Sequence, residues 1–271
     1  MKQSFIIVFG FLISITACHN LDRDNLHKET KKQLNEKNIL KAANILNDFN
    51  NWYNYTYYNI HLAQDFIALD TNSSAINKKQ FLEDLATGKF VPLKINSESH
   101  LPNHQLYKLN KNDSDITSTI SQMATTEILH LKMEGKELPD YNFQDLKGRN
   151  YKKSITKGKM VVIKCWYIHC LACVREFPEL NVLVNEYKNR EDILFISLAM
   201  DSEKDLLSFL SKNPFNYSVI PNVEKYMNEQ LNITEYPTHI LVDKNGKIVK
   251  VVNAINDLMP FIKKQAEQTS I

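Results

Sequence analysis

The hydrophobic pattern in the second half of the chain predicts alternating strands and helices. Residues 159–166 and 192–199 contain unbroken apolar runs, which are typical of strands buried on both faces of a sheet. We expect one helix over 170–188 after the first run and another after the second, where Ser202 and Asp205 form a capping box. Strands and helices in this order predict a mixed central sheet with helices on its faces.

A hairpin and a helix are expected to complete this half. The stretches 238–243 and 247–252 are both strand-like, and Asn245-Gly246 between them predicts a type I′ turn. Apolar residues at helical spacing over 255–268 predict a last helix. The fold class expected for this half is therefore α/β.

Between residues 38 and 135 the pattern is less regular and predicts a small α+β domain. Pro92 limits its strand at 89–95 to a sheet edge or a bulge. The aromatic run at 51–59 is expected to pack on a sheet face, with a ligand-binding surface as the alternative. No motif in this domain indicates its role. The expected elements are a helix at 39–49, strands at 51–59 and 66–70, a helix at 76–86, strands at 89–95 and 104–109, and a helix at 116–134.

The first 17 residues have the pattern of a secretory signal peptide. Lys2 supplies a positive charge, and an apolar run follows from Phe5 to Ile15. That run is about half of the roughly 20 residues that a membrane-spanning helix needs. We therefore expect export rather than a membrane span, and a polar tether over 18–37.

The end of this segment resembles the bacterial lipobox. The sequence I-T-A-C over 15–18 places a small residue before Cys18. The resemblance implies that Cys18 becomes the first residue and carries the lipids of a permanent membrane anchor. His19 stands where an inner-membrane retention signal typically has Asp, so we expect an outer-membrane anchor facing the periplasm. An ordinary signal peptide that contains a cysteine is the alternative.

Composition narrows the function classes. Among 271 residues, 43% are hydrophobic and 24% charged, which is typical of a globular protein. The formal net charge is only +2 and no block of like charges occurs, so nucleic acid is not an expected partner. Four cysteines are too few for a disulfide-stapled scaffold.

Three of the four cysteines lie within C-W-Y-I-H-C-L-A-C, residues 165–173. Cys170 and Cys173 form a C-x-x-C pair directly after a predicted buried strand. A zinc site needs four ligands, and a c-type haem needs a histidine where Val174 stands, so neither a metal nor a haem is expected. A redox-active dithiol fits this position, and an inert structural disulfide is the alternative.

The start of a helix gives the two cysteines different surroundings. Unpaired backbone N–H groups there favour an anion, so Cys170 should be partly ionised and exposed at the tip. Cys173 should point inward, because it shares one helical face with a row of apolar residues, namely Phe177, Leu180, Val184 and Tyr187.

From Leu138 to the C-terminus the sequence resembles the TlpA/ResA-like branch of the thioredoxin superfamily. The resemblance implies a thioredoxin-like fold over 136–271, thiol-disulfide exchange, membrane tethering and no dissociable cofactor. It rests on L-P-D-Y-N-F-Q-D-L-K-G at 138–148, W-x-x-x-C-x-x-C at 166–173, E-F-P at 176–178, Y-P-T at 236–238 and V-D-K-N-G-K-I-V at 242–249.

By this resemblance Cys170 is the nucleophile and Cys173 the resolving thiol. Glu176 matches an acid that could relay a proton, provided that burial raises its pKa. Pro237 matches the proline that is cis in this superfamily and faces the dithiol. It would turn the Tyr236 backbone toward a substrate strand.

Two further matched residues complete the expected site, and three departures stand out. Trp166 and Thr238 are expected beside the substrate. Leu171-Ala172 between the cysteines lacks the proline that the family often has. Lys164 stands where the branch usually has Asn, and either favours the thiolate or extends to solvent. Cys165 replaces an aromatic residue and is expected to pack in the core, with a regulatory or alternative disulfide as the alternative.

The function expected from these features is an exported, lipid-anchored thiol-disulfide oxidoreductase acting as a reductase. Its partners would be disulfides or thiols of exported proteins, a membrane electron donor, and the membrane through the lipid. A peroxiredoxin-like peroxidase is one alternative, although Tyr167 stands three residues before Cys170 where such enzymes need Thr or Ser. A surface-binding lipoprotein that uses the domain as a scaffold is the other.

Overall fold

The computed structural model describes residues 42–95, 100–110 and 113–268. The described residues divide into two units, with the boundary between Tyr55 and Thr56. The predicted signal peptide, the tether and Cys18 lie outside the described residues. The domain boundary predicted between residues 135 and 136 stays a prediction. No helix in the described part of the chain is long and apolar enough to cross a membrane.

The aromatic run at 51–59 is helical, so the predicted strand there was wrong. Helix α2 spans Phe49–Asn59. The Asp48 carboxylate accepts a hydrogen bond from the Asn51 backbone N–H at 2.9 Å, which caps the start of this helix. Trp52 and Thr56 are buried while Tyr57 is exposed, as expected on a helix. A local cap has therefore overridden the strand preference of aromatic residues.

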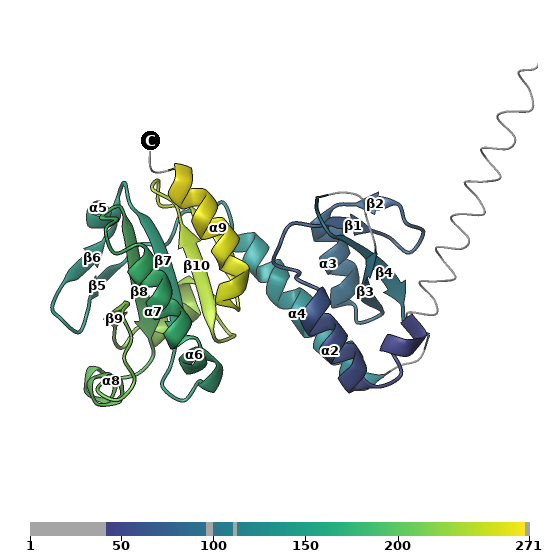
Figure 1. Ribbon diagram of the computed structural model, residues 1–271, viewed down its shortest axis with the longest axis horizontal. Helices are drawn as coiled ribbons and strands as arrows, with labels where there is room; N and C mark the ends of the chain where they lie inside the picture. The colour runs from purple at the N-terminus through teal and green to yellow at the C-terminus, as the bar shows by residue number, and fades with distance from the viewer. Residues whose placement is uncertain (1–41, 96–99, 111–112, 269–271) are drawn as a thin grey trace, which may run out of the picture. The chain divides into compact units, whose positions relative to one another are not determined.

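A four-stranded sheet follows, with the strand order β2-β1-β4-β3 (Figure 1). Pro92 lies in β3, which is an edge strand as predicted. The Asn77 side chain caps α3, and Asp113 caps α4. The elements are β1 (Ile67–Leu69), β2 (Ala75–Ile76), α3 (Lys78–Ala86), β3 (Phe90–Ile95), β4 (Asn103–Lys108) and α4 (Ser114–Met133).

A five-stranded mixed sheet forms the second layered structure, with the order β11-β10-β7-β8-β9. Central β7 is parallel to β8 and antiparallel to β10. The elements are β5 (Asn142–Gln144), β6 (Asn150–Lys152), α5 (Lys153–Thr156), β7 (Met160–Trp166), α6 (Leu171–Arg175), α7 (Phe177–Glu186), β8 (Ile193–Ala199), α8 (Glu203–Leu210), β9 (Ser218–Ile220), the π-helix η1 (Tyr226–Gln230), β10 (Thr238–Val242), β11 (Ile248–Val252) and α9 (Ile255–Gln268).

The two faces of this sheet are covered differently. Helices α7 and α9 lie side by side on one face, where Leu180 and Ile262 join a core that includes Val162 of β7 (Figure 1). On the other face Cys165 packs with Met227 of η1. This is the thioredoxin-like arrangement expected from the sequence, a mixed sheet flanked by helices.

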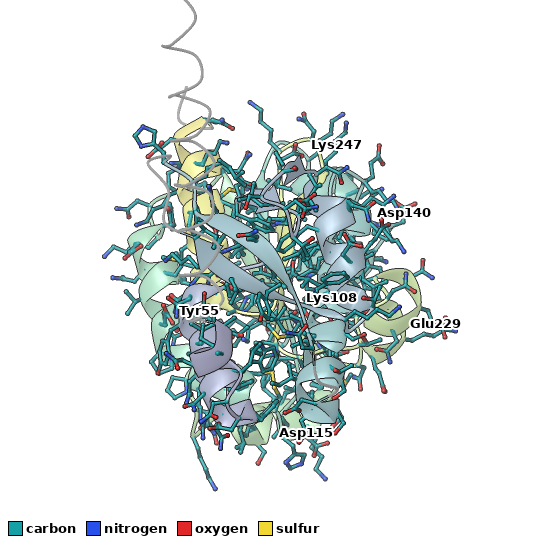
Figure 2. The ribbon with its side chains drawn as sticks, turned by 90° about the vertical axis from the view of Figure 1, so that its right-hand side faces the viewer. Tyr55, Lys108, Asp115, Asp140, Glu229 and Lys247 are labelled. Atoms are coloured by element: carbon teal, nitrogen blue, oxygen red, sulfur yellow. A yellow bond between two sulfur atoms is a disulfide. The ribbon has the colours of Figure 1, made fainter. Side chains whose placement is uncertain are left out.

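Most charged side chains are exposed, but two lysines are not. The side chains of Asp140, Glu229 and Lys247 point away from the ribbon into solvent (Figure 2). Lys164 and Lys250, by contrast, are buried. A buried ammonium needs an anionic partner, so these two lysines mark places where charge has been paired inside the protein.

The single helix predicted over 170–188 is broken in two at Glu176. Helix α6 ends at Arg175 and α7 begins at Phe177. Pro178 lies in the first turn of α7, where its missing N–H is not needed. If one helix continued through this point, the Pro178 ring would clash with the carbonyl of Val174, four residues earlier. The break follows from this proline.

The turn between β10 and β11 differs from the predicted type I′. Gly246 has φ +83, but Asn245 is not in the positive region, as that turn type would require. The Asp243 carboxylate instead accepts the backbone N–H groups of Asn245 and Lys247, both at 2.9 Å. This side chain stabilises a longer loop. The cap predicted for α8 is present, because the Asp205 N–H donates to Ser202 Oγ at 3.2 Å.

The outer edge of β11 is covered by the segment that follows α4. The Gly135 N–H donates to the Ile248 carbonyl at 2.7 Å, and the Ile248 N–H donates to the Lys136 carbonyl at 2.8 Å. Glu134 pairs with the buried Lys250 ammonium at 2.8 Å. The backbone N–H and carbonyl of Ile248 on this side of the strand are therefore occupied within the same chain.

Candidate active site

The two cysteines of the C-x-x-C pair form a disulfide at the end of β7. Cys170 and Cys173 have Cα atoms 5.2 Å apart. Cys170 is the N-cap residue of α6, and the Cys173 backbone N–H donates to its Sγ at 3.2 Å. The same N–H would stabilise a Cys170 thiolate once the disulfide is reduced.

Cys170 is less accessible than predicted. Only 6% of its surface is exposed in this oxidised state, against 0% for Cys173. Cys170 is more exposed than Cys173, as predicted. The prediction that Cys170 is exposed at the tip is nevertheless wrong for the disulfide form. Its neighbour Leu171 is 71% exposed, so the tip of the motif presents an apolar side chain.

An apolar cluster supports the disulfide from behind. Trp166 and Phe177 pack edge to face with ring centroids 5.0 Å apart, in the same cluster as both cysteines. Trp166 is fully buried. It therefore supports the dithiol and does not reach a substrate in this state, contrary to the expected contact.

The Tyr236–Pro237 peptide bond is cis, as the resemblance implied. The Tyr236 ring packs against the cluster that holds the cysteines and meets Tyr167 edge to face at 5.5 Å. Within the described residues, no hydrogen bond uses the Tyr236 backbone N–H or carbonyl. This short stretch can therefore pair with an extended chain.

Thr238 does not have the free hydroxyl that a substrate contact needs. It is 1% exposed, and its hydroxyl donates to the Glu235 carbonyl at 2.6 Å. The Asn253 amide donates to the same hydroxyl at 3.0 Å and to the Pro237 carbonyl at 2.8 Å. Thr238 thus holds the cis-proline loop in place, together with an asparagine that sequence reasoning missed.

Glu176 lies at the break between α6 and α7, and its carboxylate accepts three donors. The Lys164 ammonium of β7 and His239 Nε2 of β10 both contact Oε2, the latter at 2.9 Å. The Ile255 N–H at the start of α9 donates to Oε1 at 3.1 Å. One side chain therefore ties four elements together.

These contacts overturn the expected ionisation of Glu176. Burial alone would raise its pKa, but the hydrogen bond from His239, followed by the Lys164 ammonium, lowers the pKa to about 2. Lys164 does not extend to solvent either, since its side chain is 0% exposed. Burial lowers the pKa of Lys164, and Glu176 opposes that effect.

His239 was missed by sequence reasoning. It lies in the apolar run T-H-I-L of β10 and is 0% exposed. Burial, then the Lys164 charge, lowers its pKa, so the ring is neutral. Its Nε2–H donates to Glu176, and Nδ1 has no partner within the described residues. The sequence signal that could have identified His239 is a polar ring within a strand that is predicted to be buried on both faces.

Cys165 is a free thiol that is buried in the core, as predicted. It belongs to the cluster on the face of the sheet opposite to α7. Burial raises its pKa to about 12, with Lys164 opposing the shift. A thiol held neutral in this way is a poor nucleophile.

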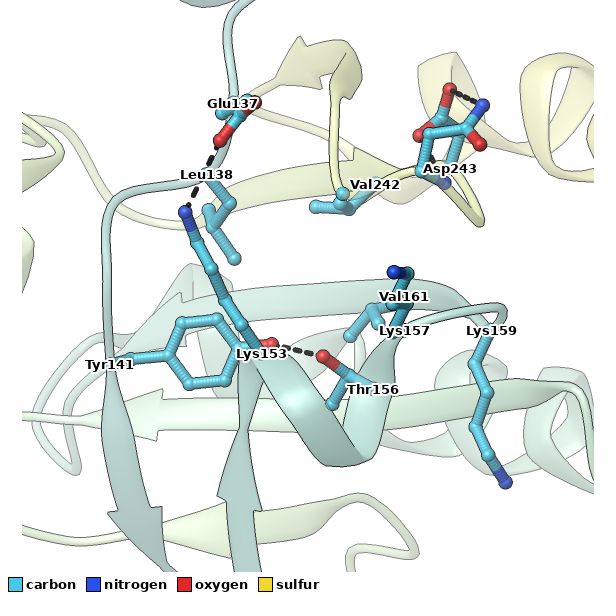
Figure 3. A pocket seen from close by; sticks show the side chains of 12 residues that line it. Glu137, Leu138, Tyr141, Lys153, Thr156, Lys157, Lys159, Val161, Val242 and Asp243 are labelled. Atoms are coloured by element: carbon cyan, nitrogen blue, oxygen red, sulfur yellow. Dashed lines mark hydrogen bonds and ion pairs between the residues drawn. The ribbon is translucent and has the colours of Figure 1, made fainter.

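A separate cavity of about 140 Å³ lies at the opposite end of β7, beside Val161 (Figure 3). Tyr141 and Thr156 share a hydrogen bond of 2.5 Å in its wall, and Lys153 lies 3.4 Å from Glu137 at its rim. No cysteine lines this cavity. The part of the chain that the structure describes holds no cluster of His, Cys, Asp or Glu suited to a metal ion.

A dithiol that follows the central strand and begins a helix is typical of the thioredoxin superfamily. The chain carries a thiol-disulfide oxidoreductase domain of that class. Residues 135–251 match the model of the AhpC/TSA family.

Curated relatives agree with this class. The chain is 27% identical over 140 residues to thiol-disulfide oxidoreductase ResA of Bacillus subtilis (strain 168), which covers 48% of this chain and 76% of the relative. It is 27% identical over 117 residues to thioredoxin-like protein YneN of the same organism, covering 42% and 68%. Among solved structures, the thioredoxin domain of a thiol-disulfide oxidoreductase from Bacteroides vulgatus matches with TM-score 0.44 and 26% identity, covering 48% of this chain and 96% of that one.

Proposed function

We propose that this protein is an exported reductase that transfers two electrons from the Cys170–Cys173 dithiol to disulfides of exported proteins. The observation that carries the proposal is the pair itself, with Cys170 at the start of α6 accepting the Cys173 N–H. The dithiol supplies the redox chemistry, so no dissociable cofactor is required.

The exchange has two balanced steps. The Cys170 thiolate attacks one sulfur of the substrate disulfide, a mixed disulfide forms, and the other substrate sulfur leaves as a thiolate and takes up a proton. Cys173 then loses its proton and attacks Cys170 Sγ, which releases the second substrate thiol. The substrate is reduced and the pair is oxidised to the observed disulfide. A membrane electron donor would reduce it again.

The positions of the two sulfurs support Cys170 as the nucleophile and Cys173 as the resolving thiol. Cys170 is the more accessible sulfur and has a backbone donor, which lowers the energy of its thiolate. Cys173 is fully buried, so it can attack only a partner that Cys170 has already captured. The Tyr236 backbone, which has no hydrogen-bond partner within the described residues, would hold the substrate as an added strand beside the same cluster.

A trapping variant tests this function. Cys173→Ser cannot resolve the mixed disulfide, so the protein should accumulate covalent adducts with exported proteins that dithiothreitol releases. The measurement is a non-reducing gel followed by mass spectrometry. Cys170→Ser should form none, and Cys165→Ser combined with Cys173→Ser is the matched control that should keep them.

Two outcomes would contradict the proposal. An absence of adducts together with no reduction of insulin by dithiothreitol-primed protein would favour the scaffold function. Consumption of hydrogen peroxide without insulin reduction would favour the peroxidase.

We further propose that the protein is held at the periplasmic side of the outer membrane by lipid on Cys18. The I-T-A-C sequence over 15–18 supports this, and His19 is the reason for choosing the outer membrane. Cys18→Ser should move the mature protein from the membrane pellet to the soluble fraction and leave insulin reduction unchanged. A variant that stays in the pellet would refute the anchor.

A further inference from the structure

Three ionisable side chains lie together behind the dithiol, and the exchange steps above use none of them. Lys164, Glu176 and His239 come from β7, the α6–α7 break and β10. The side chains of Lys164 and His239 are 0% exposed, and that of Glu176 is 15% exposed. Ionisable groups with shifted pKa values are enriched at functional sites, which makes these three candidates for a role at the dithiol.

The contacts of Glu176 leave little freedom to its carboxylate. Its two oxygens accept Lys164 Nζ, His239 Nε2 and the Ile255 N–H. Each of these donors stabilises the ionised form. To accept a proton from Cys173, the carboxylate would have to give up one or more of them. This geometry is unsuited to a proton relay through Glu176.

The position of Glu176 nevertheless makes its charge important to the dithiol. It is three residues after Cys173 and caps the helix that carries both cysteines. A lone carboxylate three residues along a helix from a thiolate would repel it. The Lys164 ammonium on the same carboxylate offsets this repulsion, because a contact ion pair has a much weaker field than either charge alone.

We propose that Lys164 and His239 are positioning residues that hold Glu176 as a fixed, compensated anion, so that the dithiol faces a constant ion pair rather than a titrating acid. This inference rests on the proposed exchange function, because the ion pair matters only if the dithiol reacts. The experiments below measure the ion pair directly and do not depend on that function. Lys164 supplies the balancing charge. His239 supplies a neutral N–H, which is the second hydrogen-bond donor to Oε2 and so fixes the orientation of the carboxylate.

The remaining titratable neighbours do not disturb this arrangement. Cys165, next to Lys164, is neutral because burial raises its pKa to about 12. Tyr217, which senses the Glu176 charge, is neutral because burial raises its pKa as well. The Lys164–Glu176 pair therefore supplies the fixed charge in this group across the neutral pH range.

The test is the pH dependence of Cys170 alkylation in the reduced protein, followed by mass spectrometry. The wild type should show one transition. Lys164→Met leaves the Glu176 charge uncompensated, so the midpoint should rise by about one pH unit and the rate near neutral pH should fall about tenfold. Lys164→Met combined with Glu176→Gln removes both charges and should return the rate to within about twofold of wild type.

His239 is tested by a matched pair of variants. His239→Gln keeps an N–H donor and should preserve the single transition. His239→Leu removes the donor, so Glu176 should titrate at higher pH and the alkylation profile should gain a second inflection. A general loss of packing would affect both variants alike.

A measurement on the wild-type protein needs no variant to fold. The Glu176 carboxyl carbon, followed by NMR in the reduced protein, should remain in its ionised position down to about pH 4. Titration of that carbon above pH 5, or an unchanged midpoint in folded Lys164→Met, would overturn the proposal. If these results hold while insulin is not reduced, the charge arrangement stands and the proposed function fails.

Discussion

Each of the two larger sheets buries one histidine, and the two are treated differently. His239 on β10 donates to a carboxylate that also holds a lysine. His104 on β4 lies instead against the Phe66 ring, with ring centroids 4.8 Å apart. Its Nδ1 has no partner within the described residues. Burial, then the Lys94 charge, lowers the pKa of His104 to about 4.

The difference shows in which sheet this chain buries charged side chains. In the four-stranded sheet a neutral ring packs against Phe66 and, among the residues that the structure describes, forms no ion pair with a carboxylate. In the five-stranded sheet an ion pair is placed at the C-terminal end of α6, the helix that begins at the dithiol. Burying an ion pair gains little stability over apolar packing, so its place beside the redox site is better explained by chemistry than by folding.

The largest expected effect comes from breaking the ion pair on one side only. Glu176→Leu leaves the Lys164 ammonium buried without its partner, which should lower the free energy of unfolding by about 3–5 kcal/mol. Adding Lys164→Met should recover most of that loss. Urea unfolding of the oxidised proteins measures both, and equal stabilities for the single and double variants would contradict the pairing.

His104 should make stability depend on pH without any ion pair. Its folded pKa of about 4 lies below the ordinary value of 6.5. The stabilising effect of the neutral ring is therefore complete above pH 6.5 and is lost as the pH falls toward 4. Between pH 7 and 5 this loss is about 2 kcal/mol, and His104→Leu should remove it.

Urea unfolding at pH 7 and pH 5 measures this difference. His100→Leu, at an exposed position, is the matched control and should keep the wild-type dependence. If His104→Leu also keeps it, the buried ring is not the group that titrates.

The smallest expected effect concerns Cys165, which shares β7 with Lys164 but takes no part in the charge pairing. Cys165→Ala removes only the sulfur atom from the core, so the free energy of unfolding should fall by about 1 kcal/mol. The initial rate of insulin reduction should not change. A large loss of rate at unchanged stability would give the third cysteine a chemical role.

The sequence was most informative where local pattern and tertiary structure agree. The buried strands β7 and β8, the helix α9 and the dithiol at a helix start all follow from apolar runs and cysteine spacing. These features depend on neighbouring residues alone. The cis bond at Pro237 came only from the family resemblance.

The errors arose where one polar side chain decides the structure. Asp48 starts a helix in a run whose aromatic residues favour a strand. Asp243 selects a longer loop over the turn that Asn-Gly favours. In both cases a carboxylate satisfies backbone N–H groups more effectively than the expected element would have done.

The charge arrangement behind the dithiol could not be read from sequence. Glu176 is 12 residues from Lys164 and 63 residues from His239 along the chain. The three meet only because β7, β10 and the start of α7 converge in the fold. The pKa of Glu176 therefore moved in the direction opposite to the one that burial alone suggests.

The covered edge of β11 has a consequence for solubility. An unprotected edge strand offers a row of N–H and C=O groups to which a strand of another molecule can add, and aggregation often begins in this way. Here Gly135 and Lys136 occupy the Ile248 backbone, and the Glu134 carboxylate lies 3.4 Å from the Val251 nitrogen. The same carboxylate oxygen pairs with the buried Lys250 ammonium, which holds it at this edge. Addition of an unwanted strand along β11 is thereby hindered at Ile248 and Val251.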